Sequence, residues 1–218
     1  DFLRTTNRRI FAADDVCLVI KDFGGKVLGK PIQVIGADHQ NKADIASAKA
    51  REWIDNEKVD MITGLLNSGC ALAVQKLAGD KKRITMNTGA ASTDLTNKAC
   101  TPYGIHYVYD TYALGKVTGQ AVVQRGGKSW YFITADYAFG QSLEANTTKF
   151  GPQMGGKVLG SVRHPLSTAD FSSYLLQAQS SGAQIIGLAN AGGDTINAIK
   201  QAREFGIDKK GQTLVGLL

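Results

Sequence analysis

Short aliphatic and β-branched runs alternate with amphipathic stretches along most of the chain. Period-two and continuously apolar patterns predict strands, over residues 31–38, 59–66, 83–89, 129–135, 157–164, 183–190 and 212–218. Apolar residues at helical spacing predict helices between them, over residues 41–58, 68–82, 111–125, 141–150, 171–182 and about 191–205. Strands that alternate with helices in this way are typical of α/β folds with parallel sheets covered on both faces.

The ends of several helices carry sequence signals. Asn41 followed by Asp44, and Ser167 followed by Asp170, have the spacing of capping boxes and predict two helix starts there. Gly206 follows an amphipathic run and predicts a helix end.

Three of these helices have an apolar stripe that we expect to face a core. The stripes consist of Ala43, Ala46, Ala50, Trp53 and Ile54 in the first helix, Leu114, Val117, Thr118, Ala121 and Val122 in another, and Ile196, Ile199, Ala202 and Phe205 in the last.

Residues 101–110, TPYGIHYVYD, interrupt the alternation with four aromatic or imidazole rings and show no clear element. We interpret this segment as the crossing between two lobes. The predicted organisation is two Rossmann-like lobes with parallel sheets, lobe I over residues 1–108 and lobe II over residues 109–218.

Composition is that of an ordinary globular protein, with 43% hydrophobic and 20% charged residues among 218. The formal net charge is +6, but the basic clusters are short and lie near predicted helix ends, where cations complement the helix dipole. We therefore predict no nucleic-acid partner. No apolar run approaches the roughly 20 residues of a membrane span, and the first residues lack a signal-peptide core, so any export signal is expected to have been removed.

The three cysteines are Cys17, Cys70 and Cys100, and no CxxC pair occurs. This spacing gives no support for a zinc site or thioredoxin-type chemistry. A disulfide between Cys70 and Cys100 and two free thiols are both compatible with the sequence.

Catalytic and cofactor motifs are incomplete. GGKVLGKP matches GxxxxGK, but Pro31 replaces the Ser or Thr that a P-loop needs and a strand follows. GGKS lacks the earlier glycine, and GxGxxG, HExxH and GxSxG are absent. Asp38, His39 and Asp136 are acid–base candidates, although carboxylates at strand ends are more often helix caps. We predict no enzyme activity, no cofactor and no metal.

Small polar turns recur at the carboxyl ends of the predicted strands: NSG (67–69), GAAST (89–93), DYAFG (136–140) and ANAGGDT (189–195). Ligands of open α/β sheets bind at this edge, where helix N-termini offer N–H groups to an anion. The stretch NTGAASTDLT (87–96) has few bulky side chains that would block such an approach. Ordinary capping explains part of this pattern, and the recurrence favours a carboxylate site.

These residues carry a resemblance to a known family. Residues 59–115, ITADYAFGQSLEANTTKF and SSGAQIIGLANAGGDTINAIKQAREFGI resemble the periplasmic solute-binding proteins of branched-chain amino acid ABC transporters, especially members that carry aromatic acids or other small carboxylates. The resemblance runs from about residue 22 to the end.

The resemblance implies a type I periplasmic binding fold whose two lobes close on one small carboxylate, with a membrane permease as partner, a periplasmic location and a monomeric state. It also implies the ligand-binding residues, which are Ser68, Gly69, Ala90, Ala91, Ser92, Tyr109, Tyr137, Phe139, Asn190 and Ala191.

Two features depart from the family pattern. Residues 1–15 show neither the usual apolar first strand nor the glycine-rich ligand loop, and the family continues well beyond Leu218, so we expect a chain truncated at its C-terminus. A cytoplasmic ligand sensor of the same fold is the alternative function, and a Rossmann-like enzyme is a third. Because Asp194 is a weak candidate to pair with an ammonium group, an acid without an amine is favoured over an amino acid.

Overall fold

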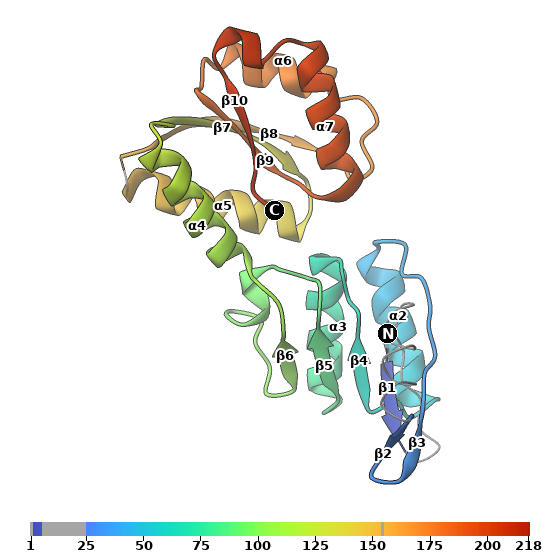
Figure 1. Ribbon diagram of the computed structural model, residues 1–218. Coiled ribbons are helices and arrows are strands. Elements are labelled where there is room, and N and C mark those ends of the chain that lie inside the picture. Colours follow the sequence, from blue (N-terminus) through green and yellow to red (C-terminus); the bar gives the residue numbers. More distant parts are fainter. Residues whose placement is uncertain (1, 6–24, 154) are drawn as a thin grey trace. The chain divides into compact units, whose positions relative to one another are not determined.

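The computed structural model describes residues 2–5, 25–153 and 155–218 (Figure 1). The chain forms two compact units, Asp1–Val108 and Tyr109–Leu218. Each is described by itself below, as unit 1 and unit 2.

Unit 1 contains a six-stranded sheet with the order β2-β3-β1-β4-β5-β6. The strands are β1 (Phe2–Thr5), β2 (Lys26–Val27), β3 (Lys30–Gln33), β4 (Met61–Thr63), β5 (Ile84–Asn87) and β6 (Gly104–His106). β4, β5 and β6 pair in parallel, whereas β1 pairs antiparallel with β3 and β4. The carboxyl ends of the three parallel strands therefore lie at one edge of the sheet.

Helices α2 (Ala43–Asp55) and α3 (Ser68–Asp80) pack together in unit 1, and the 3-10 helix η1 (Thr93–Leu95) follows β5. The core includes Trp53 from α2, Ile62 from β4 and Val74 from α3. As predicted, Ala46, Ala50, Trp53 and Ile54 of α2 are buried, while Ala43 is exposed. α3 contacts both α2 and β5, and it begins at Ser68, shortly after β4 ends at Thr63.

Unit 2 contains an all-parallel sheet with the order β10-β9-β7-β8. Its strands are β7 (Ser129–Ala135), β8 (Lys157–His164), β9 (Ile185–Ala189) and β10 (Thr213–Gly216), and its helices are α4 (Thr111–Gln124), α5 (Ala138–Gln153), α6 (Ser172–Ser180), α7 (Gly192–Glu204) and the 3-10 helix η2 (Asp208–Lys210). Within this unit α4 and α5 lie on one face of the sheet, and α6 and α7 on the other (Figure 1). The central strand β9 is buried throughout because both faces are covered.

The predicted apolar face of α4 is only partly correct: Leu114, Thr118 and Val122 are half-buried, but Ala121 is exposed. The buried residues are Thr111, Gly115, Gly119 and Val123, whereas Val117 is 67% exposed. α4 packs on α5 through small residues, and a Cβ on Gly115 would lie 2.9 Å from the Thr147 backbone nitrogen. Close backbone approach decided this face rather than side-chain hydrophobicity.

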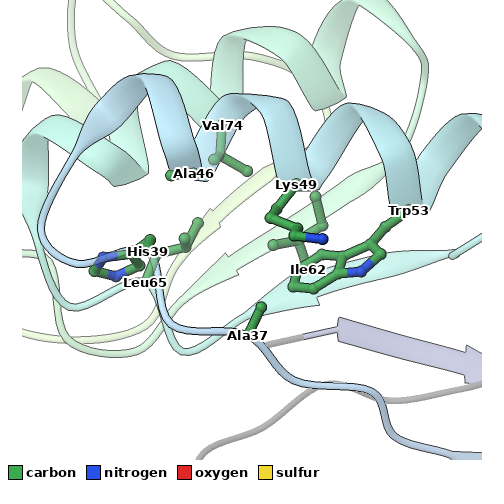
Figure 2. A pocket seen from close by; sticks show the side chains of 8 residues that line it. All are labelled: Ala37, His39, Ala46, Lys49, Trp53, Ile62, Leu65 and Val74. Atoms are coloured by element: carbon green, nitrogen blue, oxygen red, sulfur yellow. The ribbon is translucent and has the colours of Figure 1, made fainter.

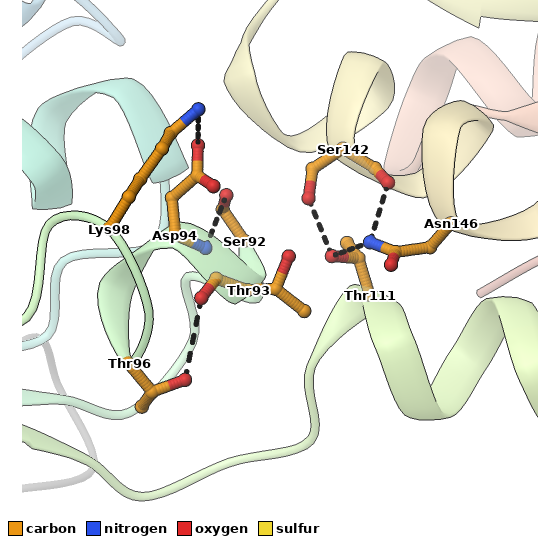
Figure 3. A network of polar contacts seen from close by, with 8 residues as sticks. All are labelled: Ser92, Thr93, Asp94, Thr96, Lys98, Thr111, Ser142 and Asn146. Atoms are coloured by element: carbon orange, nitrogen blue, oxygen red, sulfur yellow. Dashed lines mark hydrogen bonds and ion pairs between the residues drawn. The ribbon is translucent and has the colours of Figure 1, made fainter. Parts of the chain in front are cut away.

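A polar cluster joins the start of α4 to α5. The hydroxyls of Thr111 and Ser142 lie 2.7 Å apart, and the Asn146 amide donates to both the Thr111 hydroxyl and the Ser142 carbonyl (Figure 3). These bonds hold the first turn of α4 on α5, just after unit 2 begins.

The predicted face of α7 is only partly correct. Ala202 is buried, but Ile196 and Ile199 are 53% and 42% exposed, and Asp194 is buried instead. Asp194 turns inward because its carboxylate accepts backbone hydrogen bonds. The helix end is confirmed, since Phe205 is the C-cap and Gly206 follows with φ +61°.

Both predicted capping boxes are wrong. Asn41 has φ 55° and Lys42 is the N-cap of α2 without a side-chain bond. Ser167 has φ 62°, and α6 begins only at Ser172, whose N–H donates to the carboxylate of Asp170 at 2.8 Å. Short polar side chains such as Asp170 accept hydrogen bonds from nearby backbone N–H groups in turns, and this competes with the start of a helix.

The predicted α/β class with parallel sheets is confirmed, and strands 129–135 and 157–164 have the predicted bounds. The remaining strands are shorter, and the first ends at Gln33. Segment 101–110 contains β6, and Phe2–Thr5 forms a strand where no apolar strand was expected. Cys70 and Cys100 are free thiols, and Cys17 lies outside the described residues.

Candidate functional site

Two of the predicted ligand turns meet at the carboxyl edge of the unit 1 sheet. The Asn67 side chain caps α3 by accepting from the N–H groups of Gly69 and Cys70, at 2.9 and 3.1 Å. Ser68, the first residue of α3, accepts the Ser92 N–H on its Oγ at 3.2 Å. This bond ties the turn after β4 to the loop after β5, so the structure brings Ser68, Gly69 and Ser92 together.

The loop after β5, residues 88–92, is named the ligand loop below. Its central residue Ala90 is fully buried, and its N–H donates to the Leu65 carbonyl at 3.0 Å. The Ala90 carbonyl accepts from Nε2 of His106 at 2.7 Å. Ser92 ends the loop and caps η1, because its Oγ accepts the Asp94 N–H at 3.3 Å (Figure 3).

The expectation that these turns leave their backbone N–H groups bare is wrong for three residues. The N–H groups of Gly69, Ala90 and Ser92 all donate within unit 1. The Ala91 N–H has no hydrogen-bond partner among the described residues. That these residues bind a ligand stays a prediction. In it, the serine hydroxyls supply more of the hydrogen-bond donors than the backbone N–H groups do.

The hydroxyls of Ser68 and Ser92 are acceptors in their bonds to backbone N–H groups. Ser68 Oγ and Ser92 Oγ each accept one backbone N–H, and within the described part of the chain neither hydroxyl donates to an acceptor. A hydroxyl has one hydrogen and two lone pairs. Together with the Ala91 N–H, the loop region can therefore offer three donors.

Gln75 on α3 bonds to the segments on both sides of the ligand loop. It is 1% exposed, its Oε1 accepts from the Asn87 amide at 3.0 Å, and its Nε2 donates to the carbonyls of Leu95 and Ala99, both at 2.8 Å. Neither Gln75 nor His106 was among the predicted site residues. A polar residue in the buried stripe of α3, beside Ala71, Val74 and Ala78, was a signal for Gln75.

The second predicted ligand edge lies at the carboxyl ends of β7 and β9 in unit 2. Gly140 lies against both strands: a Cβ there would overlap the Ala135 carbonyl and lie 2.9 Å from the Ala189 carbonyl oxygen. The ring centroids of Tyr137 and Phe139, near the start of α5, are 5.9 Å apart. Burial, with a smaller contribution from the charge of Asp194, raises the pKa of Tyr137 to about 12. Its phenol is therefore neutral at physiological pH.

Asn190 belongs to a buried polar chain. The Nδ1–H of His164 donates to the Pro165 carbonyl at 2.8 Å, and Nε2 of the ring accepts from the Asn190 amide at 3.1 Å. The Asn190 Oδ1 accepts from the Thr195 hydroxyl at 2.8 Å. These bonds hold the loop between β9 and α7, and a ligand contact by Asn190 stays a prediction.

Both oxygens of the buried Asp194 carboxylate are engaged. They accept the N–H groups of Ser167 at 3.2 Å and Thr168 at 2.9 Å. Ala191 is the N-cap of α7, and Gly192 follows with φ +58°. Tyr109 is 52% exposed at the start of unit 2. Through its bonds to Ser167 and Thr168, Asp194 stabilises the turn before α6.

Unit 1 also contains a small cavity of about 20 Å³, enough for a single water molecule. Lys49 and Trp53 of α2 lie at one side of it, with His39 at the other (Figure 2). Nδ1 of His39 lies 3.7 Å from Sγ of Cys70. Burial lowers the pKa of His39 and raises that of Cys70 to about 11, so both groups are neutral at physiological pH.

Metal-ligand clusters and membrane-spanning helices are both absent from the described residues. In that part of the chain, no group of three His, Cys, Asp or Glu side chains is placed to hold a metal ion. None of the helices there is long and apolar enough to cross a membrane.

Comparison with known proteins decides the family. The profile of a family described as "Periplasmic binding protein" matches residues 13–218. The chain belongs to this periplasmic binding protein family. Membership agrees with the observed α/β fold and its parallel sheets.

Three family members show how far the similarity reaches. The Leu/Ile/Val-binding protein homolog 6 of Brucella melitensis is 26% identical over 195 residues, which cover 87% of this chain and 49% of that protein. A periplasmic binding protein from Burkholderia mallei has 60% identity and a TM-score of 0.91, covering 93% of this chain and 54% of that one. The chain spans about half the length of the relatives it matches.

The third relative has a named ligand. It is a solute-binding protein of an ABC transporter from Rhodopseudomonas palustris, solved with 3,4-dihydroxybenzoic acid. It shares 28% identity with this chain at a TM-score of 0.83, covering 92% of this chain and 55% of that one.

Proposed function

We propose that this chain is part of the substrate-binding component of an ABC transporter, which holds a small carboxylate in the periplasm and delivers it to a membrane permease. Family membership and the relatives above support this function. Periplasmic binding proteins are binding components rather than enzymes, and the proposal includes no catalytic step.

The donors at the ligand loop are the observation that carries the proposal. The hydroxyls of Ser68 and Ser92 and the N–H of Ala91 can all donate, and the backbone groups beside them are engaged. A carboxylate only accepts hydrogen bonds, and donors to a charged acceptor form the stronger class of such bonds. The loop is therefore suited to a carboxylate and poorly suited to an amide, which also presents donors.

An aromatic acid without an amine fits better than an amino acid. An ammonium group needs an acceptor, and the candidate carboxylate, Asp194, is buried and oriented toward the backbone N–H groups of Ser167 and Thr168. The relative solved with a dihydroxybenzoic acid supports the same ligand class. We propose 4-hydroxybenzoate and benzoate as the first ligands to test.

Calorimetric titration of the full chain tests the proposal. We expect binding of 4-hydroxybenzoate, weaker or absent binding of 4-hydroxybenzamide, and weaker binding of leucine and phenylalanine. Removing a donor to a charged group costs about 1.5–3 kcal/mol, so Ser68→Ala and Ser92→Ala should each weaken binding by about tenfold or more.

Ser173→Ala is the matched control, because Ser173 is exposed on α6 of unit 2. This variant should bind as the wild type does. Equal affinity for the acid and its amide, or no affinity for any acid, would contradict the proposed function.

A further inference from the structure

His106 lies beside the ligand loop without belonging to it. It is the last residue of β6, and its register partner is Asn87, the last residue of β5. From this position its Nε2 reaches the Ala90 carbonyl at 2.7 Å. A carbonyl oxygen only accepts, so the ring must carry its hydrogen on Nε2 and donate it.

This bond acts on the same peptide group that carries the Ala91 N–H. The carbonyl of Ala90 and the N–H of Ala91 share one planar trans peptide unit, in which the two groups point in opposite directions. Holding the carbonyl toward β6 therefore turns the Ala91 N–H away from β6. The donated bond also polarises the peptide and strengthens its N–H as a donor.

The other hydrogen bonds that hold the loop do not involve the Ala90–Ala91 peptide. Gln75 fixes the loop at Asn87 and again beyond it at Leu95, and Ser68 holds the Ser92 N–H. The Ala90 N–H, bonded to the Leu65 carbonyl, belongs to the preceding peptide unit. Among the described residues, the Ala90–Ala91 peptide has His106 as its hydrogen-bond partner.

We propose that His106 is a positioning residue for the ligand: by holding the Ala90 carbonyl, it aims the Ala91 N–H at the carboxylate. The inference rests on the proposed function and adds to it a residue that need not touch the ligand. It predicts that a side chain with a donor at the same reach can replace the histidine.

The test compares His106→Gln with His106→Phe in the full chain. Glutamine offers an N–H donor, whereas phenylalanine keeps the ring and removes the donor. Calorimetric titration with 4-hydroxybenzoate should show a Kd about tenfold or more higher in His106→Phe. The Kd of His106→Gln should stay within about threefold of the wild-type value, because the donor is kept.

Ile105→Phe is the control, because Ile105 is 41% exposed and precedes His106 on β6. It should leave the Kd unchanged. His106→Leu replaces His106→Phe if the phenylalanine variant does not fold. Equal loss of affinity in the Gln and Phe variants, or none in either, would overturn the proposal.

A second readout does not depend on the ligand. The backbone amide resonance of Ala91 in the free protein should shift in His106→Phe and return toward its wild-type position in His106→Gln. If the wild type binds none of the acids, the proposed function fails, while this resonance still decides the role of His106. An unchanged resonance in His106→Phe refutes the positioning role whether or not an acid binds.

Discussion

Replacing Gln75 by leucine should strongly destabilise unit 1, because this one side chain makes three hydrogen bonds. Leucine has nearly the same size but lacks the amide that bonds Asn87, Leu95 and Ala99. Asn87 and Leu95 are both buried, so their amide and carbonyl would lose a partner away from water. The Ala99 carbonyl belongs to a half-buried residue that solvent reaches more easily.

The size of the loss follows from the two buried groups. Each buried polar group left without a partner costs about 1–3 kcal/mol, and the added apolar surface of leucine returns a part of this. We expect a net loss of about 3 kcal/mol. With a urea slope of about 1.5 kcal/mol per molar, the unfolding midpoint of unit 1 falls by about 2 M.

The assay needs a signal from unit 1 alone. Trp53 lies in unit 1 and Trp130 in unit 2, and these are the two tryptophans of the chain. In a Trp130→Phe background, tryptophan fluorescence therefore reports on the unfolding of unit 1. The variants to compare are Gln75→Leu and the same chain without it.

Lys76→Leu is the matched control, since Lys76 is the exposed neighbour of Gln75 on α3. It should change the free energy of unfolding by less than about 0.5 kcal/mol. A loss of less than about 1 kcal/mol in Gln75→Leu would refute the reasoning, because the loop would then not depend on the buried amide.

Further predictions concern packing, pH and thiols. Gly140→Ala should destabilise unit 2 by about 3 kcal/mol in thermal unfolding, whereas Gly151→Ala on the same helix, where a Cβ meets no atom within 4 Å, should be neutral or stabilising; similar results for both would contradict the packing argument. The pKa of Tyr137 is raised to about 12 by burial, so its contribution to stability is complete below the ordinary tyrosine value of about 10 and is lost as the pH rises toward 12. Urea unfolding across that range should show a smaller alkaline loss in Tyr137→Phe, and an identical loss would refute the assignment. In a Cys17→Ser background, a thiol reagent should modify the exposed Cys100 quickly and the buried Cys70 only after unfolding; rapid reaction of both would contradict the burial of Cys70.

Strands could be predicted closely where an apolar or alternating pattern continues over seven or eight residues, in the inner strand β7 and also in the edge strand β8. Residues 129–135 and 157–164 form strands with the predicted bounds, since continuous or alternating apolar character leaves little freedom there. The predicted faces of α4 and α7 were only partly correct, for a different reason. Gly115 allows a close approach to α5, and Asp194 bonds to a distant turn, and neither effect has a periodic signal.

The same distinction between local pattern and tertiary contact applies to the candidate site. The turns after β4 and β5 could be predicted because small polar residues follow apolar runs, and parallel topology brings strand ends together. That Ser92 bonds to Ser68, and that His106 holds the Ala90 carbonyl, could not be predicted. Such bonds join residues 16 and 24 positions apart in the chain.

The sequence by itself determined the α/β class, the order of most elements and the location of the polar strand ends, because these depend on local patterns of apolar and turn-forming residues. Tertiary structure alone decided which N–H groups are engaged, which donors stay available and which buried side chains hold the ligand loop. The physical reason is that a hydrogen bond depends on distance and direction, and only the packed fold fixes these for side chains far apart in sequence.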